Sequence, residues 1–294
     1  MSNFSGKLSK IANNTDRFLR GVFLKQKNNS GLIKPMKYGI FSGGKRLRSA
    51  IVVNTGKIFN INYKKLIMVG SAIECIHSYS LIHDDLPSMD NDDLRRGKLS
   101  VHKKFNEFTA ILAGNSLLTL AFEILSGNNL KVSENCKNQL VNTLSMCSGH
   151  SGLAGGQYSD LTFENKSILK KDTINMQKKK TGELFGFCCE SVAILKGLNF
   201  KKRKKLRDIG VDIGLLFQTI DDLIDYQGDS SVVGKPTRRD QKKGKATLIN
   251  LIGYKETVNF AKKLKKIIDK KIKKYGTKAN DLLESVEFIA ERKF

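Results

Sequence analysis

Apolar residues recur at helical spacing in six long stretches of the chain, and no stretch shows the strict alternation of a half-buried strand. The six stretches run over residues 64–86, 109–125, 137–147, 172–195, 204–226 and 257–274. Breaks that contain glycine separate them. Only three prolines occur, and proline inside a helix breaks it. The pattern predicts an all-α protein, a bundle of about ten or more helices.

The chain shows no fixed-length repeat and no linker rich in serine, glycine or proline. Its 294 residues are enough to bury a sizeable core. We therefore expect a single domain over residues 1–294.

Composition and targeting features favour a cytoplasmic protein. No uninterrupted apolar run reaches the ~18 residues of a membrane span, and the N-terminal segment MSNFSGKLSKIANN lacks the apolar core of a signal peptide. The five cysteines form no paired CxxC framework, so we expect reduced, mostly buried thiols. The expectation is a protein of the cytoplasm with no membrane span.

The formal charge of +24 raises the possibility of a nucleic-acid-binding protein. Lysines, however, are spread along the whole chain, and the densest run, KKRKK at residues 201–205, has no interleaved aromatic residues for base stacking. A solvated surface explains the lysines better, and we expect no nucleic-acid partner. A diffuse positive field would still attract small polyanionic substrates.

Acidic residues crowd the segment LIHDDLPSMDNDDLRRG, residues 81–97, at the end of a predicted helix. Leu86 precedes a proline, which ends the helix near Asp85. Asp84, Asp85 and Asp90 follow a D-D-x4-D pattern, and carboxylates at a helix C-terminus repel each other and oppose the helix dipole. Divalent cations would relieve this conflict, although a solvated acidic turn would explain the cluster taken alone.

A second acidic group lies in FQTIDDLIDYQGD, residues 217–229. Gln218, Asp221, Asp222 and Asp225 have i, i+3, i+4 and i+7 spacing, which is one stripe of a helix. Carboxylates beside apolar residues are costly to bury without cations. Mg²⁺, held by a few carboxylates and by substrate phosphates, suits two such groups in one chain.

Five segments together resemble the signatures of the trans-isoprenyl diphosphate synthase family, in the expected order and over about residues 39–254. Two are the aspartate segments, the first in the bacterial form with two extra residues between aspartates. The other three are SGGKRLR, KKKTGELF and GKPTRRDQKKGKAT. The resemblance implies helices around a central cavity, the isoprenoid synthase fold. It also implies a homodimeric enzyme that joins isopentenyl diphosphate head-to-tail to an allylic diphosphate.

The resemblance also assigns roles at matching positions. Asp84 and Asp90 would bind two Mg²⁺ ions with support from Asp85, and Asp221 would bind a third with help from Asp222 and Asp225 through waters. The allylic diphosphate would be held by Arg95, Lys180, Thr181, Gln218, Lys235 and Lys245. Isopentenyl diphosphate would be held by Lys45, Arg48, His77 and Arg96. Lys180, Asp84 and Asp221 would take part in catalysis most directly.

Product length in this family depends on the residues four and five positions before the first aspartate. These are Ser80 and Tyr79, and a bulky Tyr79 would form a floor that stops growth at fifteen carbons. The expected product is (2E,6E)-farnesyl diphosphate made from dimethylallyl or geranyl diphosphate. Geranylgeranyl diphosphate synthase is the main alternative. Tyr79 and Phe217 are also expected to supply aromatic cavity walls.

Several other interpretations of single motifs are weaker. GIFSGGKR, residues 39–46, nearly matches a nucleotide-binding phosphate loop, but Arg46 replaces Ser/Thr and no strand precedes it. A diphosphate-binding loop before a helix fits better. His77 alone would suggest a packed histidine, but its place seven residues before Asp84 favours substrate binding. His83, just before Asp84, is expected either to be structural or to support the neighbouring site residues without contacting the ligand.

Three other classes of protein remain as rivals. A terpene cyclase would need no isopentenyl site, so Lys45, Arg48 and Arg96 argue against it. A non-catalytic prenyl synthase subunit would be expected to lose aspartates, and both acidic groups are intact. A basic nucleic-acid-binding protein is the third. One departure from the family pattern is GKATLIN, residues 244–250, which lacks the usual Tyr-Pro after the threonine and should affect the start of the next helix.

Overall fold

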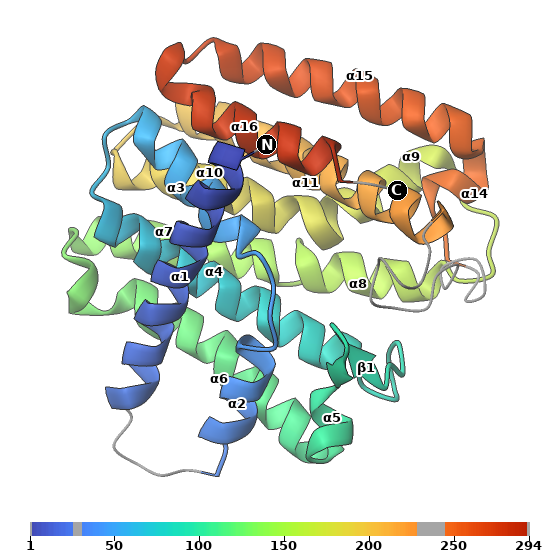
Figure 1. The fold of residues 1–294 in the computed structure, drawn as a ribbon, viewed down its shortest axis with the longest axis horizontal. Coiled ribbons are helices and arrows are strands. Elements are labelled where there is room, and N and C mark those ends of the chain that lie inside the picture. Colours follow the sequence, from blue (N-terminus) through green and yellow to red (C-terminus); the bar gives the residue numbers. More distant parts are fainter. Residues whose placement is uncertain (1, 26–30, 228–244, 293–294) are drawn as a thin grey trace. The chain divides into compact units, whose positions relative to one another are not determined.

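The structure, a computed structural model, describes residues 2–25, 31–227 and 245–292. Contacts divide the chain into two compact units, residues 1–56 with 61–141, and residues 57–60 with 142–294. In chain order the described elements are α1 (Ser2–Lys25), α2 (Ile33–Ile40), α3 (Leu47–Ile58), α4 (Tyr63–Asp84), β1 (Leu94–Arg95), β2 (Lys98–Leu99), α5 (Val101–Lys104), α6 (Glu107–Ser126), the 3-10 turn η1 (Asn128–Leu130), α7 (Glu134–Ser148), α8 (Leu153–Thr162), α9 (Lys170–Gln177), the π-helical turn η2 (Lys178–Gly182), α10 (Glu183–Leu195), α11 (Phe200–Gln227), α14 (Leu248–Ile252), α15 (Tyr254–Lys273), the 3-10 turn η3 (Thr277–Ala279) and α16 (Asn280–Ala290) (Figure 1).

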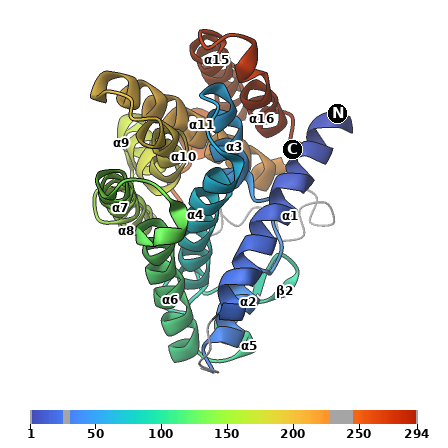
Figure 2. The ribbon, with the colours of Figure 1, turned by 90° about the vertical axis from the view of Figure 1, so that its left-hand side faces the viewer.

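The predicted all-α class is confirmed. In the first unit α4 packs against α1, α2 and α6, and Figure 2 shows it between α1 and α6. Asn62 begins the helix, because its side chain accepts a hydrogen bond from the backbone N–H of Lys64 at 3.0 Å. The helix ends at Asp84, as the proline at position 87 predicts. Most of its residues are buried, which makes α4 a core helix whose last turn carries the first acidic segment.

A two-stranded hairpin follows the acidic segment, and the periodicity did not predict it. Its register pairs Leu94 with Leu99 and Arg95 with Lys98. The two turn residues, Arg96 and Gly97, have φ of 53° and 74°. Positive φ at both central positions is the geometry of the tight hairpin turn that matches strand twist. Strands of two residues are too short to show alternation in the sequence.

In the second unit α11 packs against α10 and α15, and α15 against α16 (Figure 1). Two glycines of α11 allow a close approach to α10 and to the turn before it. A Cβ at Gly210 would lie 2.3 Å from the carbonyl oxygen of Phe185, and one at Gly214 would lie 2.7 Å from the Cα of Gly182. Neither position can take a larger residue without a shift of backbone, so these glycines fix the helix spacing.

The predicted helix over residues 172–195 is interrupted by the π-helical turn η2, which separates α9 from α10. Single π turns inside helices are rare and frequently occur at functional sites. This turn coincides with the KKKTG part of the KKKTGELF motif.

The start of α14 shows how the chain adapts to the departure in GKATLIN. Thr247 precedes the helix and accepts a hydrogen bond from the backbone N–H of Asn250 at 3.3 Å. The Asn250 side chain donates to the carbonyl of Lys245 at 2.8 Å. A threonine N-cap therefore begins this helix without the usual Tyr-Pro.

Two of the described helices, α4 and α6, have the length and hydropathy of a membrane span, which the inspection of apolar runs did not predict. In α4, 78% of the apolar window is buried inside the protein, against 44% in α6. Burial accounts for α4 as a core helix. The absence of a membrane span stays a prediction.

All five cysteines are thiols, and four of them are buried, with Cys136 half-buried. The prediction of reduced, mostly buried thiols is therefore confirmed. Burial, which outweighs the nearby guanidinium of Arg207, raises the pKa of Cys147 to about 12.

Candidate active site

The first acidic segment folds back on the end of α4. The backbone N–H of Asp90 donates to the carbonyl of Asp84 at 2.8 Å, and that of Asp92 donates to the carbonyl of Asp85 at 3.1 Å. These bonds bring the backbones of the two predicted metal ligands, Asp84 and Asp90, into contact. Both residues are half-buried, so solvent still reaches the loop that carries them.

Asp85 has a different environment from its neighbours. It is 2% exposed, and Arg95 from β1 donates Nε–H to its two carboxylate oxygens, at 2.9 and 3.2 Å. Arg95 also lies 3.6 Å from Asp92. Burial alone would lower the pKa of Arg95, but the hydrogen bond and the charge of Asp85 outweigh burial and raise it. The geometry thus fits the predicted supporting role of Asp85.

The residues expected to bind isopentenyl diphosphate all lie in the first unit. Burial first, and then the guanidinium charges of Arg48 and Arg96 together with two further arginines, lowers the pKa of His77 well below its usual value. His77 is therefore neutral at pH 7. Arg48 is 9% exposed, whereas Lys45 is exposed. The structure brings His77, Arg48 and Arg96 into one positive field, as expected of an anion site.

The glycines of the SGGKRLR motif have a structural reason. Gly43 and Gly44 have φ of 110° and 111°, which side-chain-bearing residues rarely adopt. The guanidinium of Arg96 donates a hydrogen bond to the carbonyl of Gly43. A Cβ at Gly44 would lie 2.7 Å from Nη1 of Arg96. The loop before α3 thus lies against the hairpin turn, which places Lys45 and Arg96 in neighbouring segments.

Arg46, in the same motif, is a structural residue. It is 4% exposed, and its side chain donates to Asp16 at 2.8 Å and to the carbonyl of Ile40 at 2.5 Å. Its guanidinium also lies 3.7 Å from Glu74 of α4. These contacts tie α1, α2 and α4 together around a residue with φ of 49°. A nucleotide-binding phosphate loop would instead have Ser/Thr at this position.

The second acidic group lies along α11, with the predicted single-stripe spacing. Asp222 is 4% exposed and accepts hydrogen bonds from Gln177 at 2.7 Å and from Gln218 at 2.8 Å. Thr181 in turn donates its hydroxyl to the side-chain carbonyl of Gln218 at 2.8 Å. Asp222 is thus held by two amides, which fits its predicted indirect role.

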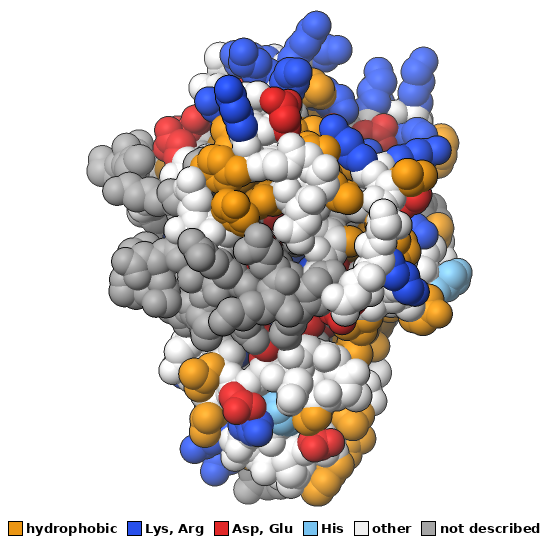
Figure 3. All heavy atoms as spheres, turned by 90° about the vertical axis from the view of Figure 1, so that its right-hand side faces the viewer, with side chains coloured by type: hydrophobic (Ala, Val, Ile, Leu, Met, Phe, Trp, Pro, Cys, Tyr) orange, Lys and Arg blue, Asp and Glu red, His pale blue; other side chains and the backbone are white. Residues whose placement is uncertain are grey.

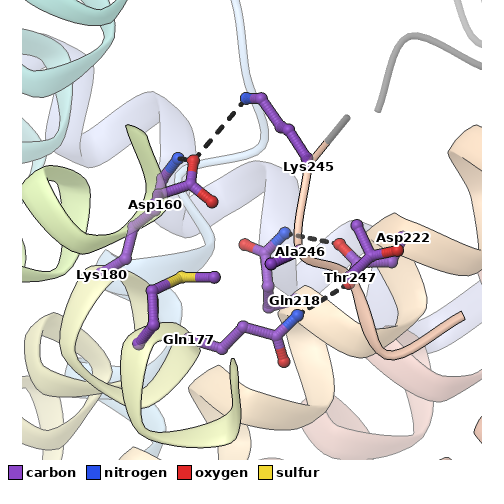
Figure 4. Close-up of a pocket in the computed structure, with 9 residues that line it drawn as sticks. Asp160, Gln177, Lys180, Gln218, Asp222, Lys245, Ala246 and Thr247 are labelled. Atoms are coloured by element: carbon purple, nitrogen blue, oxygen red, sulfur yellow. Dashed lines mark hydrogen bonds and ion pairs between the residues drawn. The ribbon is translucent and has the colours of Figure 1, made fainter. Parts of the chain in front are cut away.

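A pocket of about 50 Å³ in the second unit is lined by residues of α8, α9, η2, α11 and the segment before α14 (Figure 4). Lys180 from the π turn and Lys245 both point at Asp160, with Nζ–Oδ2 distances of 2.7 and 3.7 Å. Of the residues expected to bind the allylic diphosphate, Lys180, Gln218 and Lys245 line this pocket, and Thr181 contacts Gln218. Lys235 lies outside the described residues, and Arg95 belongs to the first unit.

Asp160 and Gln177 were not predicted as site residues. The available signal was the glycine-rich segment SGLAGGQYSDL, residues 151–161, in which an acidic residue follows small ones. Its glycines permit a close approach, since a Cβ at Gly156 would lie 2.1 Å from the backbone nitrogen of Lys180. The glycine-containing break between the predicted stretches 137–147 and 172–195 contains α8, which packs against the π turn.

Asp221, the predicted ligand of a third Mg²⁺, forms an ion pair with Arg292 near the end of the chain. The distance from Arg292 Nη1 to Asp221 Oδ1 is 2.6 Å, and the same guanidinium lies 4.8 Å from the ring centre of Phe217. The carboxylate of Asp221 is 36% exposed, so it remains accessible to ions.

The predicted chain-length residues both lie in the last turns of α4. Tyr79 is half-buried and contacts the ring of His83, with centroids 5.0 Å apart. Ser80 is 8% exposed and donates its hydroxyl to the carbonyl of His77 at 3.0 Å. Burial first, and then the charge of Asp84, raises the pKa of Tyr79, so its hydroxyl is protonated at neutral pH.

Two wider features concern ions. Among residues 2–25, 31–227 and 245–292, no group of three or more His, Cys, Asp or Glu side chains is placed to hold a metal ion by protein ligands alone. Figure 3 shows lysine and arginine side chains projecting from the top of the face it draws, the level at which α15 lies in Figure 1. The last turn of α15 carries Lys270, Lys271 and Lys273.

Comparison with known proteins identifies the family. The polyprenyl synthetase family model matches residues 29–286. The chain is 40% identical to farnesyl diphosphate synthase of Escherichia coli over 243 residues, 82% of this chain and 80% of that protein. Its fold is similar to that of a farnesyl/geranylfarnesyl diphosphate synthase from Zymomonas mobilis, with a TM-score of 0.86, 38% identity and coverage of 98% and 99% of the two chains.

A further similar structure is a geranyltransferase from Helicobacter pylori complexed with magnesium and isoprenyl diphosphate, with a TM-score of 0.84, 29% identity and coverage of 98% of this chain and 97% of that one. The family and fold predicted from the five motifs are thus confirmed, and the chain belongs to the polyprenyl synthetase family.

Proposed function

We propose that this chain is a farnesyl diphosphate synthase. It joins isopentenyl diphosphate to dimethylallyl diphosphate and then to geranyl diphosphate, giving (2E,6E)-farnesyl diphosphate. The observation that carries the proposal is that this chain belongs to the polyprenyl synthetase family and retains both acidic groups and both sets of cationic residues. Relatives from Escherichia coli, Micrococcus luteus and Bacillus subtilis, each 40% identical over most of this chain, are named farnesyl diphosphate synthases.

The donor set fits Mg²⁺. Asp84, Asp90 and Asp221 offer carboxylate oxygens from partly exposed positions, while Asp85 and Asp222 accept hydrogen bonds from protein groups. Few protein ligands per ion suit a metal that completes its shell with water and substrate phosphate. When bound, about three Mg²⁺ ions would neutralise the charge that develops on the diphosphate as the allylic C–O bond breaks.

The cations of the second unit have a matching role. Lys180 and Lys245 both lie near Asp160, and that carboxylate holds the two ammonium groups near one point. A diphosphate oxygen at this point would receive two fixed positive charges, which stabilises the leaving group in the transition state more than in the ground state. Thr181 and Gln218 add polar contacts at the same wall.

In the first unit, Arg48, Arg96 and Lys45 would hold the diphosphate of isopentenyl diphosphate without a metal. Neutral His77 adds a hydrogen bond rather than a charge. The double bond of this substrate attacks the allylic cation, and the diphosphate released from the first substrate accepts the proton lost on forming the new double bond. Water must be excluded, because it would convert the cation to an alcohol, and Tyr79 and Phe217 are suited to line apolar walls.

Geranylgeranyl diphosphate synthase is the alternative product assignment. One relative, 36% identical over 88% of this chain, is geranylgeranyl pyrophosphate synthase 4 of Arabidopsis thaliana. Tyr79 favours the shorter product because a large ring near the end of α4 leaves less room for a fourth isoprene unit. A non-catalytic subunit is disfavoured by the intact aspartates.

Three further expectations belong to the same proposal. The family model spans both compact units, which supports one functional domain over residues 1–294. Phe108, Ile111 and Leu112 of α6 are 42–66% exposed, and an exposed apolar helix face supports a homodimer. We place the enzyme in the cytoplasm, where its diphosphate substrates are soluble.

The test is incubation of the purified protein with radiolabelled isopentenyl diphosphate, geranyl diphosphate and Mg²⁺, followed by chain-length analysis. We expect a C15 product that disappears with a chelator. Absence of any prenyl product would refute the proposed activity, and a C20 product would favour the alternative.

A further inference from the structure

His83 occupies a tightly defined place between two helices of the first unit. It lies in the last turn of α4, one position before Asp84, and its Nε2 is 3.0 Å from the backbone carbonyl of Ile111 in α6. A carbonyl oxygen only accepts, so Nε2 carries the proton of the neutral ring. The histidine thus donates across the α4–α6 interface.

Gly114 of α6 leaves the space that this ring occupies. A Cβ at Gly114 would lie 2.2 Å from Nε2 of His83 and 2.4 Å from its Cδ2. Glycine inside a helix is unfavourable relative to alanine. The His83 ring that lies against Gly114 explains why glycine stands at this position. Residues of both α4 and α6 therefore define where the His83 ring lies.

The opposite contact of His83 is Tyr79, one helical turn earlier in α4. The two ring planes make an angle of 82° with centroids 5.0 Å apart, an edge-to-face arrangement that favours one relative orientation. The Tyr79 ring therefore packs against the side chain of His83, whose position is in turn held by Ile111 and Gly114. Residues at i and i+4 on one helix face are placed for such a contact.

We propose that His83, seated on Gly114, is a positioning residue that holds the Tyr79 ring and thereby sets the length of the prenyl chain. The proposal rests on the proposed function, in which Tyr79 is the floor for the growing chain. It adds that α6 takes part in specificity, through a residue that itself touches no substrate.

The test compares product lengths of six variants with those of the wild-type enzyme. His83→Gln can keep a donor to the Ile111 carbonyl but removes the ring, and Gly114→Ala forces the ring from its seat. Tyr79→Ala removes the floor itself. Gly21→Ala is the matched control, because a Cβ at Gly21 of α1 meets no atom within 4 Å. Circular dichroism and thermal unfolding show whether each variant is folded.

For Tyr79→Ala, His83→Gln and Gly114→Ala, the ratio of C20 to C15 product should rise about tenfold or more, the scale on which pocket shape discriminates small apolar groups. Gly21→Ala should keep the wild-type ratio. The double variant His83→Ala/Gly114→Ala should have the product ratio of His83→Ala alone, because the added methyl then meets empty space.

The outcomes separate the inference from the proposed function. A wild-type protein that makes no prenyl diphosphate would overturn the function. Should Tyr79→Ala lengthen the product while folded His83→Gln and folded Gly114→Ala keep the C15 product, the function stands and the role of His83 is refuted. A Tyr79→Ala enzyme that still stops at C15 also refutes it. If Gly114→Ala fails to fold, His83→Gln decides alone.

Discussion

Arg292 places its guanidinium 2.6 Å from the carboxylate of Asp221 and 4.8 Å from the centre of the Phe217 ring. A side-chain cation thus lies on the carboxylate that we assign to a magnesium ion. A guanidinium and a metal ion on one carboxylate repel each other and compete for its negative charge, so binding of one weakens binding of the other.

Replacing Arg292 with glutamine should therefore strengthen the binding of Mg²⁺. The ion pair is partly exposed, so the gain should be about two- to fivefold in dissociation constant, in line with the modest energies of such pairs. Isothermal titration with Mg²⁺ in the presence of a non-reactive allylic diphosphate analogue measures it. Lys262→Gln removes the same charge from an exposed position on α15 and should change the affinity little. If Mg²⁺ affinity rises equally in both variants, the gain comes from the lower total positive charge of the protein and not from the loss of the Arg292–Asp221 ion pair.

Asp84 and Asp90, whose backbones contact each other at the end of α4, provide the second prediction. Asp84→Ala should reduce kcat by about 10³-fold or more, because a metal ligand that acts on the leaving group is lost. Asp93→Ala removes a carboxylate from the same loop, but Asp93 is 65% exposed and pairs with Lys103. Its kcat should stay within about threefold of wild type, since an exposed ion pair contributes little. Steady-state assays decide, and near-normal turnover of Asp84→Ala would contradict the metal assignment.

The environment of His77 predicts a pH-dependent stability. Its pKa is lower in the folded protein than the ordinary 6.5, so below pH 6.5 the unfolded chain binds a proton that the folded protein does not. The contribution of neutral His77 to the free energy of unfolding is fully present above pH 6.5 and decreases as the solution is acidified. At pH 5.5 the wild-type protein should therefore be less stable than at pH 7.5 because of this group.

His77→Gln should remove that part of the acid sensitivity. Denaturant unfolding at pH 7.5 and 5.5, in both proteins, measures the difference between the two slopes of stability against pH. A wild-type histidine that titrates normally in the folded protein would give identical slopes and contradict the prediction.

The contact between α8 and the π turn provides the fourth prediction. A Cβ at Gly156 would lie 2.1 Å from the backbone nitrogen and 2.5 Å from the Cα of Lys180. Gly156→Ala should displace the π turn and reduce kcat about 10²-fold, as small displacements of binding groups do. Gly21→Ala should leave kcat unchanged. If folded Gly156→Ala turns over normally, Lys180 is not positioned by this contact or does not act in catalysis.

The sequence predicted most of the long helices, because their apolar faces repeat at helical spacing over many residues, but α1 (Ser2–Lys25) lies outside the six predicted stretches. The expected helix over 109–125 corresponds to α6, and Pro87 gave the end of α4 correctly. The hairpin around Arg96 was missed, since two-residue strands carry no period. The π turn at 178–182 was missed because its residues continue the helical pattern of their neighbours.

The candidate site was predictable where charges conflict with local rules, as with aspartates at a helix end. Asp160 and Gln177 were missed because each is an ordinary polar residue on its own helix and gains meaning only through Lys180 and Asp222. Contacts between residues distant in the chain cannot be deduced from one sequence. The same holds for the pairing of Arg292 with Asp221.

The most direct test of the central claim is a crystal structure of the protein with Mn²⁺ in place of Mg²⁺ and a non-reactive allylic thiodiphosphate. Anomalous diffraction locates the ions without assumptions about their ligands. We predict manganese peaks within coordination distance of Asp84, Asp90 and Asp221, each also bound to a phosphate oxygen. Fully occupied ligand with hydrated, ion-free carboxylates at all three residues would contradict the account.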